Sequence, residues 1–367
     1  MVRIFIVLCG GTICTSVEEM GNDRVRVISE GAGTLLQKNF YDANPELKGE
    51  VTFDCSKNFK ILSENMTIEK WNLLIDFFRE KETKLKGYDG IIIAHGTDTL
   101  AYSSAMFSLL LKSLLVPVFF VSSNAPLSND NANGNENFRA AVNCIRSRIT
   151  PGVYTVYKNP SSGRMFLHLA SRLKQCRNYE EDFYSEGAVD ITCLPAEQYA
   201  DLYKDLKQSG LKSDGRDDFT VKLSGEWHLK DCVLRIDPYV GLRYDCFDYS
   251  KFKAVLHGSY HSGTVCVTDS FKDDESKKDI SGSIMYMLDK CKNGPDVFLF
   301  PVGKNGEIYA SAKELADSDG GRIKYLYGTT VEMAYAKLLL AYSMNIENIE
   351  AFMDREFCLE MPYSRLN

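Results

Sequence analysis

The sequence of 367 residues has no excess of basic residues and no long hydrophobic run. Its 43 Lys and Arg residues are outnumbered by 50 Asp and Glu residues, which gives a formal net charge of −7 at pH 7. Binding to a nucleic-acid backbone or to anionic lipid needs a basic surface. The apolar stretches stay short of the ~20 residues that cross a bilayer, and the first one is too short for a secretory signal. We therefore expect a cytoplasmic protein that binds neither nucleic acid nor membranes.

Common motifs for metals, phosphates and dinucleotides are also missing. The eleven Cys residues include no C-x-x-C pair and no cluster with zinc spacing, so we expect no metal centre. No Lys follows the first Gly-rich turn as a phosphate loop requires, and the G-x-S-x-G elbow of serine hydrolases is absent. Cys9, Cys144 and Cys266 lie in apolar runs, which is typical of reduced, buried thiols.

Length and pattern predict two α/β domains, since about 150 residues form an average domain. Short apolar segments, typical of buried strands, alternate with segments of helical periodicity in residues 1–193. This alternation favours a large, mostly parallel sheet with helices on both faces. The polar segment 194–231 is predicted to be an interdomain linker, and 232–367 a smaller C-terminal α/β domain. In the first domain we expect strands at 2–8, 51–62, 90–95, 117–123, 152–158 and 166–170, and helices at 67–87, 99–114 and 137–148.

The loops that follow the predicted strands are the candidate binding region. In an open α/β sheet, ligands bind beyond the carboxyl ends of the strands. The loops at 9–16, 62–67, 95–99 and 122–137 are rich in Thr, Ser, Asn and Gly and poor in charge. Such loops suit the recognition of a small polar molecule by hydroxyl groups and backbone amides.

Several residues of these loops have both a chemical and a purely structural interpretation. The glycines before Thr12 allow backbone amides to face a developing negative charge, or they form an ordinary turn. Asp98 can bind a ligand ammonium group or only cap the next helix, and Thr97 can act as nucleophile or position a water molecule. A threonine nucleophile needs a base, and Lys174 is either a buried base with a depressed pKa or a solvated surface residue.

Together, these motifs resemble the bacterial-type L-asparaginases, a family of threonine amidohydrolases. The matching segments are GGTI at 10–13, SENMT at 63–67, HGTDT at 95–99 followed by LAYSS, and the Ser-x-x-Pro and Asn-Gly loop at 123–134. The resemblance extends over residues 1–185 and is visible again at 328–341. It implies hydrolysis of L-asparagine to L-aspartate and ammonia through a threonine acyl-enzyme, without a cofactor. L-Glutamine is a second candidate substrate, because one methylene group provides only about 1–3 kcal/mol of discrimination.

The resemblance also implies roles for the reacting groups. Thr12 matches the primary nucleophile of the family. Thr97, Asp98 and Lys174 match its second triad, in which Lys and Asp prepare a hydroxyl group or a water molecule. The backbone N–H groups of Gly11, Thr12 and Thr97 would form the oxyanion hole.

Other residues match the positions that hold the substrate. Ser63 and Glu64 correspond to residues that bind the α-carboxylate and the α-ammonium group, and Asp98 also pairs with that ammonium group. Ser123 lies where the family uses a backbone carbonyl to receive the amide NH₂ group. The resemblance further implies a homodimer or a homotetramer.

The sequence departs from the family pattern at several positions. The family carries a Tyr on the loop after GGTI, whereas the first Tyr here is Tyr41, so another Tyr fills this role, Thr12 is activated differently, or activity is impaired. Thr264 stands where many members have Asn, and Asn133 stands where the family tends to have Asp. Two alternatives to an L-asparaginase therefore stay open. One is an inactive homologue that binds an amino acid. The other is the amidase component of a tRNA-dependent amidotransferase, which the short segment before Thr12 disfavours.

Overall fold

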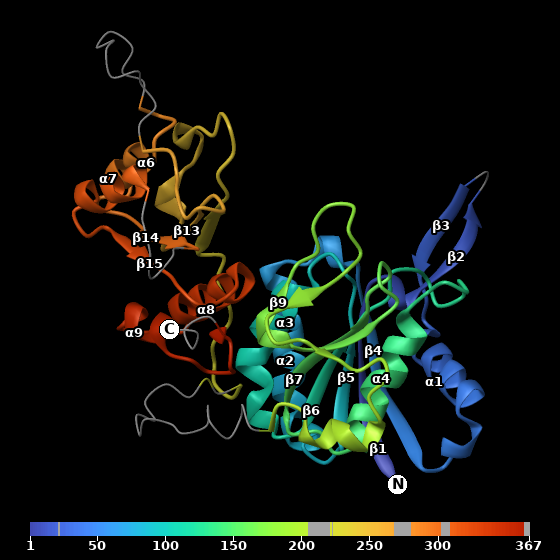
Figure 1. The fold of residues 1–367 in the computed structure, drawn as a ribbon. Coiled ribbons are helices and arrows are strands. Elements are labelled where there is room, and N and C mark those ends of the chain that lie inside the picture. Colours follow the sequence, from blue (N-terminus) through green and yellow to red (C-terminus); the bar gives the residue numbers. More distant parts are fainter. Residues whose placement is uncertain (21–22, 205–220, 222, 268–279, 302–308, 363–367) are drawn as a thin grey trace. The chain divides into compact units, whose positions relative to one another are not determined.

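The chain forms two compact units. The computed structural model describes residues 1–20, 23–204, 221, 223–267, 280–301 and 309–362 (Figure 1). One unit comprises Met1–Glu226 with Phe357–Glu360, and the other comprises Trp227–Glu356 with Met361–Asn367. Each unit is built around its own sheet.

The first unit contains a seven-stranded sheet with the strand order β11-β8-β7-β6-β5-β1-β4. Strands β7, β6, β5, β1 and β4 are neighbours in this order and pair in parallel. Strands β8 and β11 join as antiparallel strands at one edge. The predicted mostly parallel sheet is therefore confirmed. Its strands are β1 (Val2–Gly10), β4 (Val51–Ile61), β5 (Gly90–Ala94), β6 (Pro117–Val121), β7 (Gly152–Lys158), β8 (Met165–Leu169) and β11 (Val189–Asp190).

Helices cover both faces of this sheet (Figure 1). In β1, Ile4 and Ile6 join one buried cluster with residues of α1 and α4, whereas Phe5 contacts Phe77 of α2 on the opposite face. Burial on both faces explains why the strands read as continuous apolar runs rather than alternating ones. Among the described residues of this unit, the helices are α1 (Ala32–Ala43), α2 (Ile68–Leu85), α3 (Leu100–Leu111) and α4 (Gly134–Arg146).

A β-hairpin that was not predicted from the sequence follows the first strand. Strands β2 (Thr15–Met20) and β3 (Asp23–Ile28) pair antiparallel in a separate two-stranded sheet. Most of their residues are at least partly exposed. In β3 the exposed Arg24 and Arg26 alternate with the partly buried Val25 and Val27, but this alternation is short and β2 has none to match it, so the segment resembles a loop in the sequence.

The second unit is a smaller α/β domain, as expected. Its four-stranded parallel sheet has the order β12-β13-β14-β15, and Val255, Val297 and Met287 lie in its buried core. The strands are β12 (Val233–Ile236), β13 (Ala254–Gly258), β14 (Asp296–Phe300) and β15 (Ile323–Tyr325). The helices are α6 (Ile284–Lys290), α7 (Ala310–Ser318), α8 (Val331–Ser343) and α9 (Ile349–Asp354).

The chain returns to the first unit near its end. The Ser171 hydroxyl donates to the Cys358 carbonyl over 2.8 Å, and the Arg172 guanidinium donates to the Leu359 carbonyl. The buried Glu360 carboxylate accepts from the backbone N–H of Cys358 at 2.7 Å, which fixes the turn. Residues 357–360 are thus part of the first unit although 130 residues of the second unit, 227–356, precede them.

The predicted linker is described only in part. Its beginning includes a short 3-10 helix (Ala196–Asp201), after which the Tyr203 hydroxyl donates to the carbonyls of Leu167 and Gly187. This portion is therefore part of the first unit. Residues 205–220 and 222 of the predicted linker lie outside the described residues.

Burial of the cysteines agrees only partly with the sequence pattern. Cys9 and Cys144 are buried as expected, but the prediction for Cys266 was wrong, because its side chain is exposed between two buried valines. The described part of the chain contains no disulfide.

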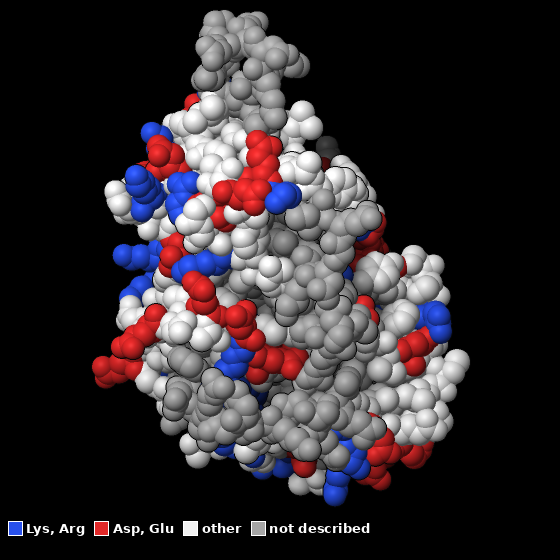
Figure 2. Space-filling view, turned by 60° about the vertical axis from the view of Figure 1, so that its left-hand side comes forward, with Lys and Arg blue, Asp and Glu red and all other residues white. Residues whose placement is uncertain are grey.

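None of the helices in the described part of the chain combines the length and apolarity needed to cross a bilayer. On the face shown in Figure 2, acidic and basic side chains of the described residues lie interspersed.

Candidate active site

Two turns meet at the carboxyl edge of the first sheet. Gly11 follows β1 with φ +73°, a left-handed conformation that favours glycine. A Cβ atom added at Gly11 would overlap the Cα of Gly96, which follows β5. The backbones just before Thr12 and Thr97 are therefore in direct contact. The parallel pairing of β1 with β5 produces this arrangement, because it brings both carboxyl ends to one edge.

A third loop is hydrogen-bonded to the second of these turns. The buried Ser63 hydroxyl donates to Asp98 Oδ2 over 3.0 Å and accepts from the Asp98 backbone N–H at 3.3 Å. The Thr99 hydroxyl donates to the Ser63 carbonyl over 2.9 Å. Thr99 is the N-cap of α3, and its side chain makes no capping hydrogen bond. Asp98 therefore binds the Ser63 loop instead of capping the helix.

A cavity of about 620 Å³ opens beside Thr97 and Asp98. These two are the predicted site residues that line it, whereas Thr12, Ser63, Glu64, Ser123 and Lys174 are not among its lining residues. The lining is completed by Asn124, Tyr157, Gln175, Cys176, Arg177, Asn178, Tyr179, Glu180 and Glu181. Sequence reasoning did not identify these residues, because most of them follow β9 in a segment without a recognisable motif.

Gln175 connects this segment to the Thr97 turn. Its side-chain amide donates to the Thr97 carbonyl over 2.8 Å, and its carbonyl oxygen accepts from the Ala101 backbone N–H at 3.1 Å. One side chain thus bridges the turn and the first residues of α3. The bridge holds the segment that follows β9 against the Thr97 turn.

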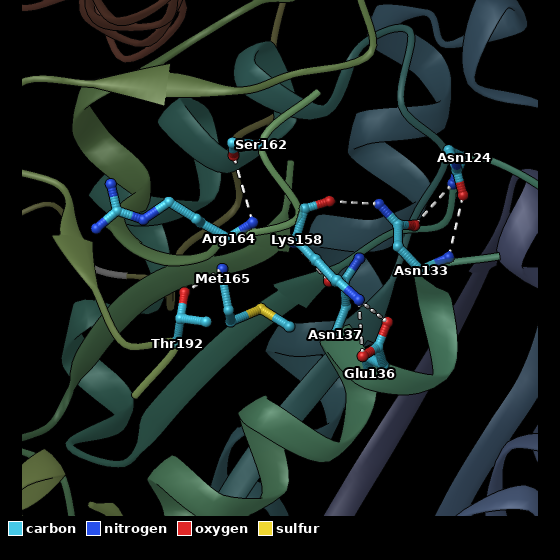
Figure 3. A network of polar contacts seen from close by, with 9 residues as sticks. All are labelled: Asn124, Asn133, Glu136, Asn137, Lys158, Ser162, Arg164, Met165 and Thr192. Atoms are coloured by element: carbon cyan, nitrogen blue, oxygen red, sulfur yellow. Dashed lines mark hydrogen bonds and ion pairs between the residues drawn. The ribbon is translucent and has the colours of Figure 1, made fainter. Parts of the chain in front are cut away.

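A pair of asparagines supports another part of the cavity lining. The side-chain oxygens of Asn124 and Asn133 each accept from the other's backbone N–H, at 3.1 and 3.0 Å (Figure 3). The Asn133 side-chain amide donates to the Lys158 carbonyl, which ties this part of the lining to the end of β7. The Asn124 amide in turn donates to Glu181 over 3.2 Å. Ser123 is buried beside this pair, and its hydroxyl donates to the Ala125 carbonyl.

Lys174 and Glu64 have exposed side chains. Lys174 lies in the two-residue strand β9 (Leu173–Lys174), which pairs with β10 (Tyr184–Ser185), and not in a loop as expected. The Lys174 side chain is exposed, which agrees with the interpretation as a solvated surface residue and not with the interpretation as a buried base. Glu64 lies in a short 3-10 helix (Ser63–Asn65), where its side chain points into solvent.

The cavity lining is predominantly acidic. Asp98, Glu180 and Glu181 contribute carboxylates, against the single guanidinium of Arg177 in the same lining. The pKa of Cys176 is raised to about 12, first by burial and then by neighbouring carboxylates that include Asp98. The surroundings therefore favour a bound ammonium group and keep the Cys176 thiol neutral.

His95 is buried, and its imidazole is a weak base. The ring is buried, and burial lowers its pKa to about 4 although the Gly96 carbonyl accepts from Nδ1 at 2.7 Å. The imidazole is therefore neutral at pH 7 and holds the turn in place.

Tyr41 does not reach this edge of the sheet. Its hydroxyl donates to the carbonyl of Val51, the first residue of β4, whereas Ile61 at the other end of β4 pairs with Gly10. About 3.3 Å per residue places Val51 and Ile61 roughly 30 Å apart. Tyr157 is the buried tyrosine that lines the cavity.

Among the described residues, no group of three His, Cys, Asp or Glu side chains could hold a metal ion. His257 and His261 are four residues apart, a spacing that can ligate metals. However, His257 bonds the Tyr244 hydroxyl through Nε2 and the Gly258 carbonyl through Nδ1.

Known proteins are similar to this chain in sequence and in fold. Residues 3–190 match the family model "Asparaginase, N-terminal". The chain is 26% identical to a glutamyl-tRNA(Gln) amidotransferase subunit of Aeropyrum pernix, over 98% of this chain and 79% of that protein. It is 27% identical to the corresponding protein of Thermofilum pendens over 67% of this chain, and it spans about half (52%) of that relative's length.

Solved L-asparaginases have the same fold along almost the whole chain. The thermostable L-asparaginase of Thermococcus kodakarensis superimposes with a TM-score of 0.66 at 18% identity, covering 98% of this chain and 99% of that one. L-asparaginase I of Vibrio cholerae gives 0.62 at 20% identity, covering 98% and 99%. Because the family model covers half of the chain, the protein belongs to the asparaginase family of amidohydrolases.

Proposed function

We propose that this protein hydrolyses the side-chain amide of L-asparagine to L-aspartate and ammonia, with L-glutamine as a second substrate. The observation that carries the proposal is the contact between the Gly11 and Gly96 backbones, because it brings two threonine-bearing turns together. The acidic lining of the adjoining cavity suits the ammonium group of an amino acid. Asp98, fixed by Ser63, is the carboxylate that we assign to this group.

The proposed reaction has two steps. The Thr12 hydroxyl attacks the amide carbon, an Oγ–C bond forms, and the C–N bond breaks as the nitrogen takes up a proton and leaves as ammonia. Backbone N–H groups of Gly11, Thr12 and Thr97 would stabilise the oxyanion. Water then attacks the acyl-enzyme, which forms aspartate and returns the proton to Thr12. Thr97, Asp98 and Lys174 are assigned to the preparation of the attacking hydroxyl group or water. In this assignment the exposed Lys174 acts from the solvent side.

The two threonines provide the test. Ammonia and aspartate are measured after incubation of the full chain with L-asparagine or L-glutamine. We expect Thr12→Ala and Thr97→Ala each to lower kcat by about 10³-fold or more. The matched control is Thr83→Ala, an exposed position in α2, which should retain full activity. Full activity in Thr12→Ala and Thr97→Ala would refute the assignment. Binding of L-asparagine without ammonia release would instead indicate an inactive, amino-acid-binding homologue.

A second candidate function is favoured by the sequence relatives. Those with 26–27% identity are named as one of the subunits of a glutamyl-tRNA(Gln) amidotransferase. In this alternative the chain supplies ammonia to a partner protein. Ammonia release from L-glutamine that requires a partner and glutamyl-tRNA would favour it, whereas full turnover by the isolated chain with L-asparagine favours the first proposal.

We further propose that the protein is cytoplasmic and forms a homodimer or a homotetramer. Light scattering on the purified protein will test the oligomeric state.

A further inference from the structure

Tyr157 has a buried hydroxyl group at the wall of the cavity. The residue lies in β7, its side chain is fully buried, and it lines the cavity together with Thr97 and Asp98. Its ring packs edge-on against Phe183, with the centroids 4.8 Å apart. Packing thus fixes the ring while the residue borders the cavity.

The Tyr157 hydroxyl oxygen makes no hydrogen bond within the described residues. Other buried tyrosines of this chain do make one: Tyr154 donates to the Thr150 carbonyl over 2.7 Å, and Tyr249 donates to the Tyr244 carbonyl over 2.8 Å. A buried hydroxyl without a partner destabilises the folded state. Its presence in a cavity wall therefore points to a partner that is not part of the protein.

The surroundings indicate which kind of atom this partner is. Burial, Cys176 and the carboxylates of Glu181 and Asp182 all raise the pKa of Tyr157, whereas an interaction with the Asn133 side-chain amide, which can only donate to the phenol oxygen, lowers it. The phenol is therefore protonated at neutral pH and has a proton to donate. A protonated, unpartnered O–H group in a residue that lines a cavity complements an acceptor, such as a carboxylate or carboxamide oxygen.

We infer that the Tyr157 hydroxyl contacts the ligand of this cavity and donates a hydrogen bond to an oxygen atom of the bound amino acid. The identity of the ligand rests on the proposed function, but the contact itself rests on the unpartnered hydroxyl. If the acceptor is the carboxylate, the contact acts mainly on substrate binding. If the acceptor is the amide oxygen, the contact acts mainly on kcat, because charge develops there during the reaction.

The test compares Tyr157→Phe with Tyr154→Phe. Both residues are buried in β7, but the Tyr154 hydroxyl has a backbone partner and its ring stacks on Phe119. We expect Tyr157→Phe to keep or raise the Tm of the unliganded protein and to weaken binding of L-aspartate, or to lower kcat/KM for L-asparagine, by about ten-fold. Tyr154→Phe should lower the Tm and leave both ligand measurements unchanged.

Each outcome bears on the inference separately from the proposed function. If the wild type turns over L-asparagine and Tyr157→Phe stays within two-fold in both measurements, the inference is wrong and the proposed function stands. A clear fall in Tm for unliganded Tyr157→Phe also contradicts it, because the hydroxyl would then be satisfied without ligand. If the wild type binds amino acids without turnover, the proposed function fails, and calorimetric affinities for both variants still decide the inference. If the wild type neither binds nor hydrolyses them, both fail.

Discussion

At the scale of single residues, Gly11 illustrates a requirement that the sequence alone makes visible. Two glycines after an apolar strand already indicated a close backbone approach, and the contact with Gly96 is that approach. Both the positive φ and the lack of space exclude a side chain at Gly11. The location of the candidate site residues at the carboxyl edge could be predicted for the same reason, since their motifs are short segments at strand ends.

A substitution at Gly11 tests this requirement. We expect Gly11→Ala to lower the free energy of unfolding by about 4 kcal/mol or more, because it adds a backbone overlap to an unfavourable φ. Gly49→Ala is the matched control: Gly49 also has a positive φ, +93°, but nothing lies within 4 Å of an added Cβ. It should cost only about 1–2 kcal/mol. Urea denaturation of both variants measures the difference, and equal losses would argue against close contact at Gly11.

Tyr157, Gln175 and Asn124 could not be predicted from the sequence. They come from different strand ends and meet only after the sheet has formed. A strand buried on both faces carries no signal for which of its side chains borders a cavity. Tyr157 therefore resembles any other core aromatic residue in the sequence.

At the scale of elements, the alternation of strands and helices predicted the parallel sheet. Strand β7 begins and ends at the predicted residues, and α2 begins after its predicted cap, Thr67, which accepts from the Lys70 N–H. The hairpin β2–β3 and helix α1 were not predicted. The alternation of Arg24 and Arg26 with Val25 and Val27 in β3 is short, and β2 (TSVEEM) has no matching alternation, so the hairpin's periodicity is weak.

Gln175 couples two elements, β9 and α3, through the Thr97 turn. We expect Gln175→Ala to lower kcat about ten- to hundred-fold, because misplacement of a reacting group by about 1 Å can have such an effect. The Tm should fall by only a few degrees. Gln198→Ala, an exposed residue of the 3-10 helix Ala196–Asp201, serves as control and should match the wild type. Unchanged steady-state kinetics of Gln175→Ala would show that the bridge has no positioning role.

At the scale of the whole molecule, three buried histidines make stability depend on pH. Burial lowers the pKa of His95 and His257 to about 4 and that of His168 to about 3. Each folded pKa lies below the unfolded value of about 6.5. The unfolded chain therefore takes up protons first, so stability is complete above about pH 6.5 and falls as the pH decreases towards 4 and 3.

We expect each of these histidines to remove about 3 kcal/mol of stability between pH 6.5 and pH 4. Urea denaturation across this range measures the loss. His168→Gln should flatten the pH dependence, whereas the exposed His261→Gln should leave it unchanged. An identical pH dependence in wild type and His168→Gln would contradict the neutral, buried state of His168.

The return of residues 357–360 to the first unit was not visible in the sequence, because the segment is short and carries no periodic pattern. It has a consequence for the covalent integrity of the molecule. A single backbone cleavage within 227–356 leaves one product continuous with residues 1–226 and the other held through the hydrogen bonds from Ser171 and Arg172. Residues 227–356 are in effect an insertion into the first unit's chain, which continues on both sides of them. One proteolytic cut can open this closed loop, but the C-terminal anchor and the pairing of β12 to β15 within the second unit both keep the fragments associated.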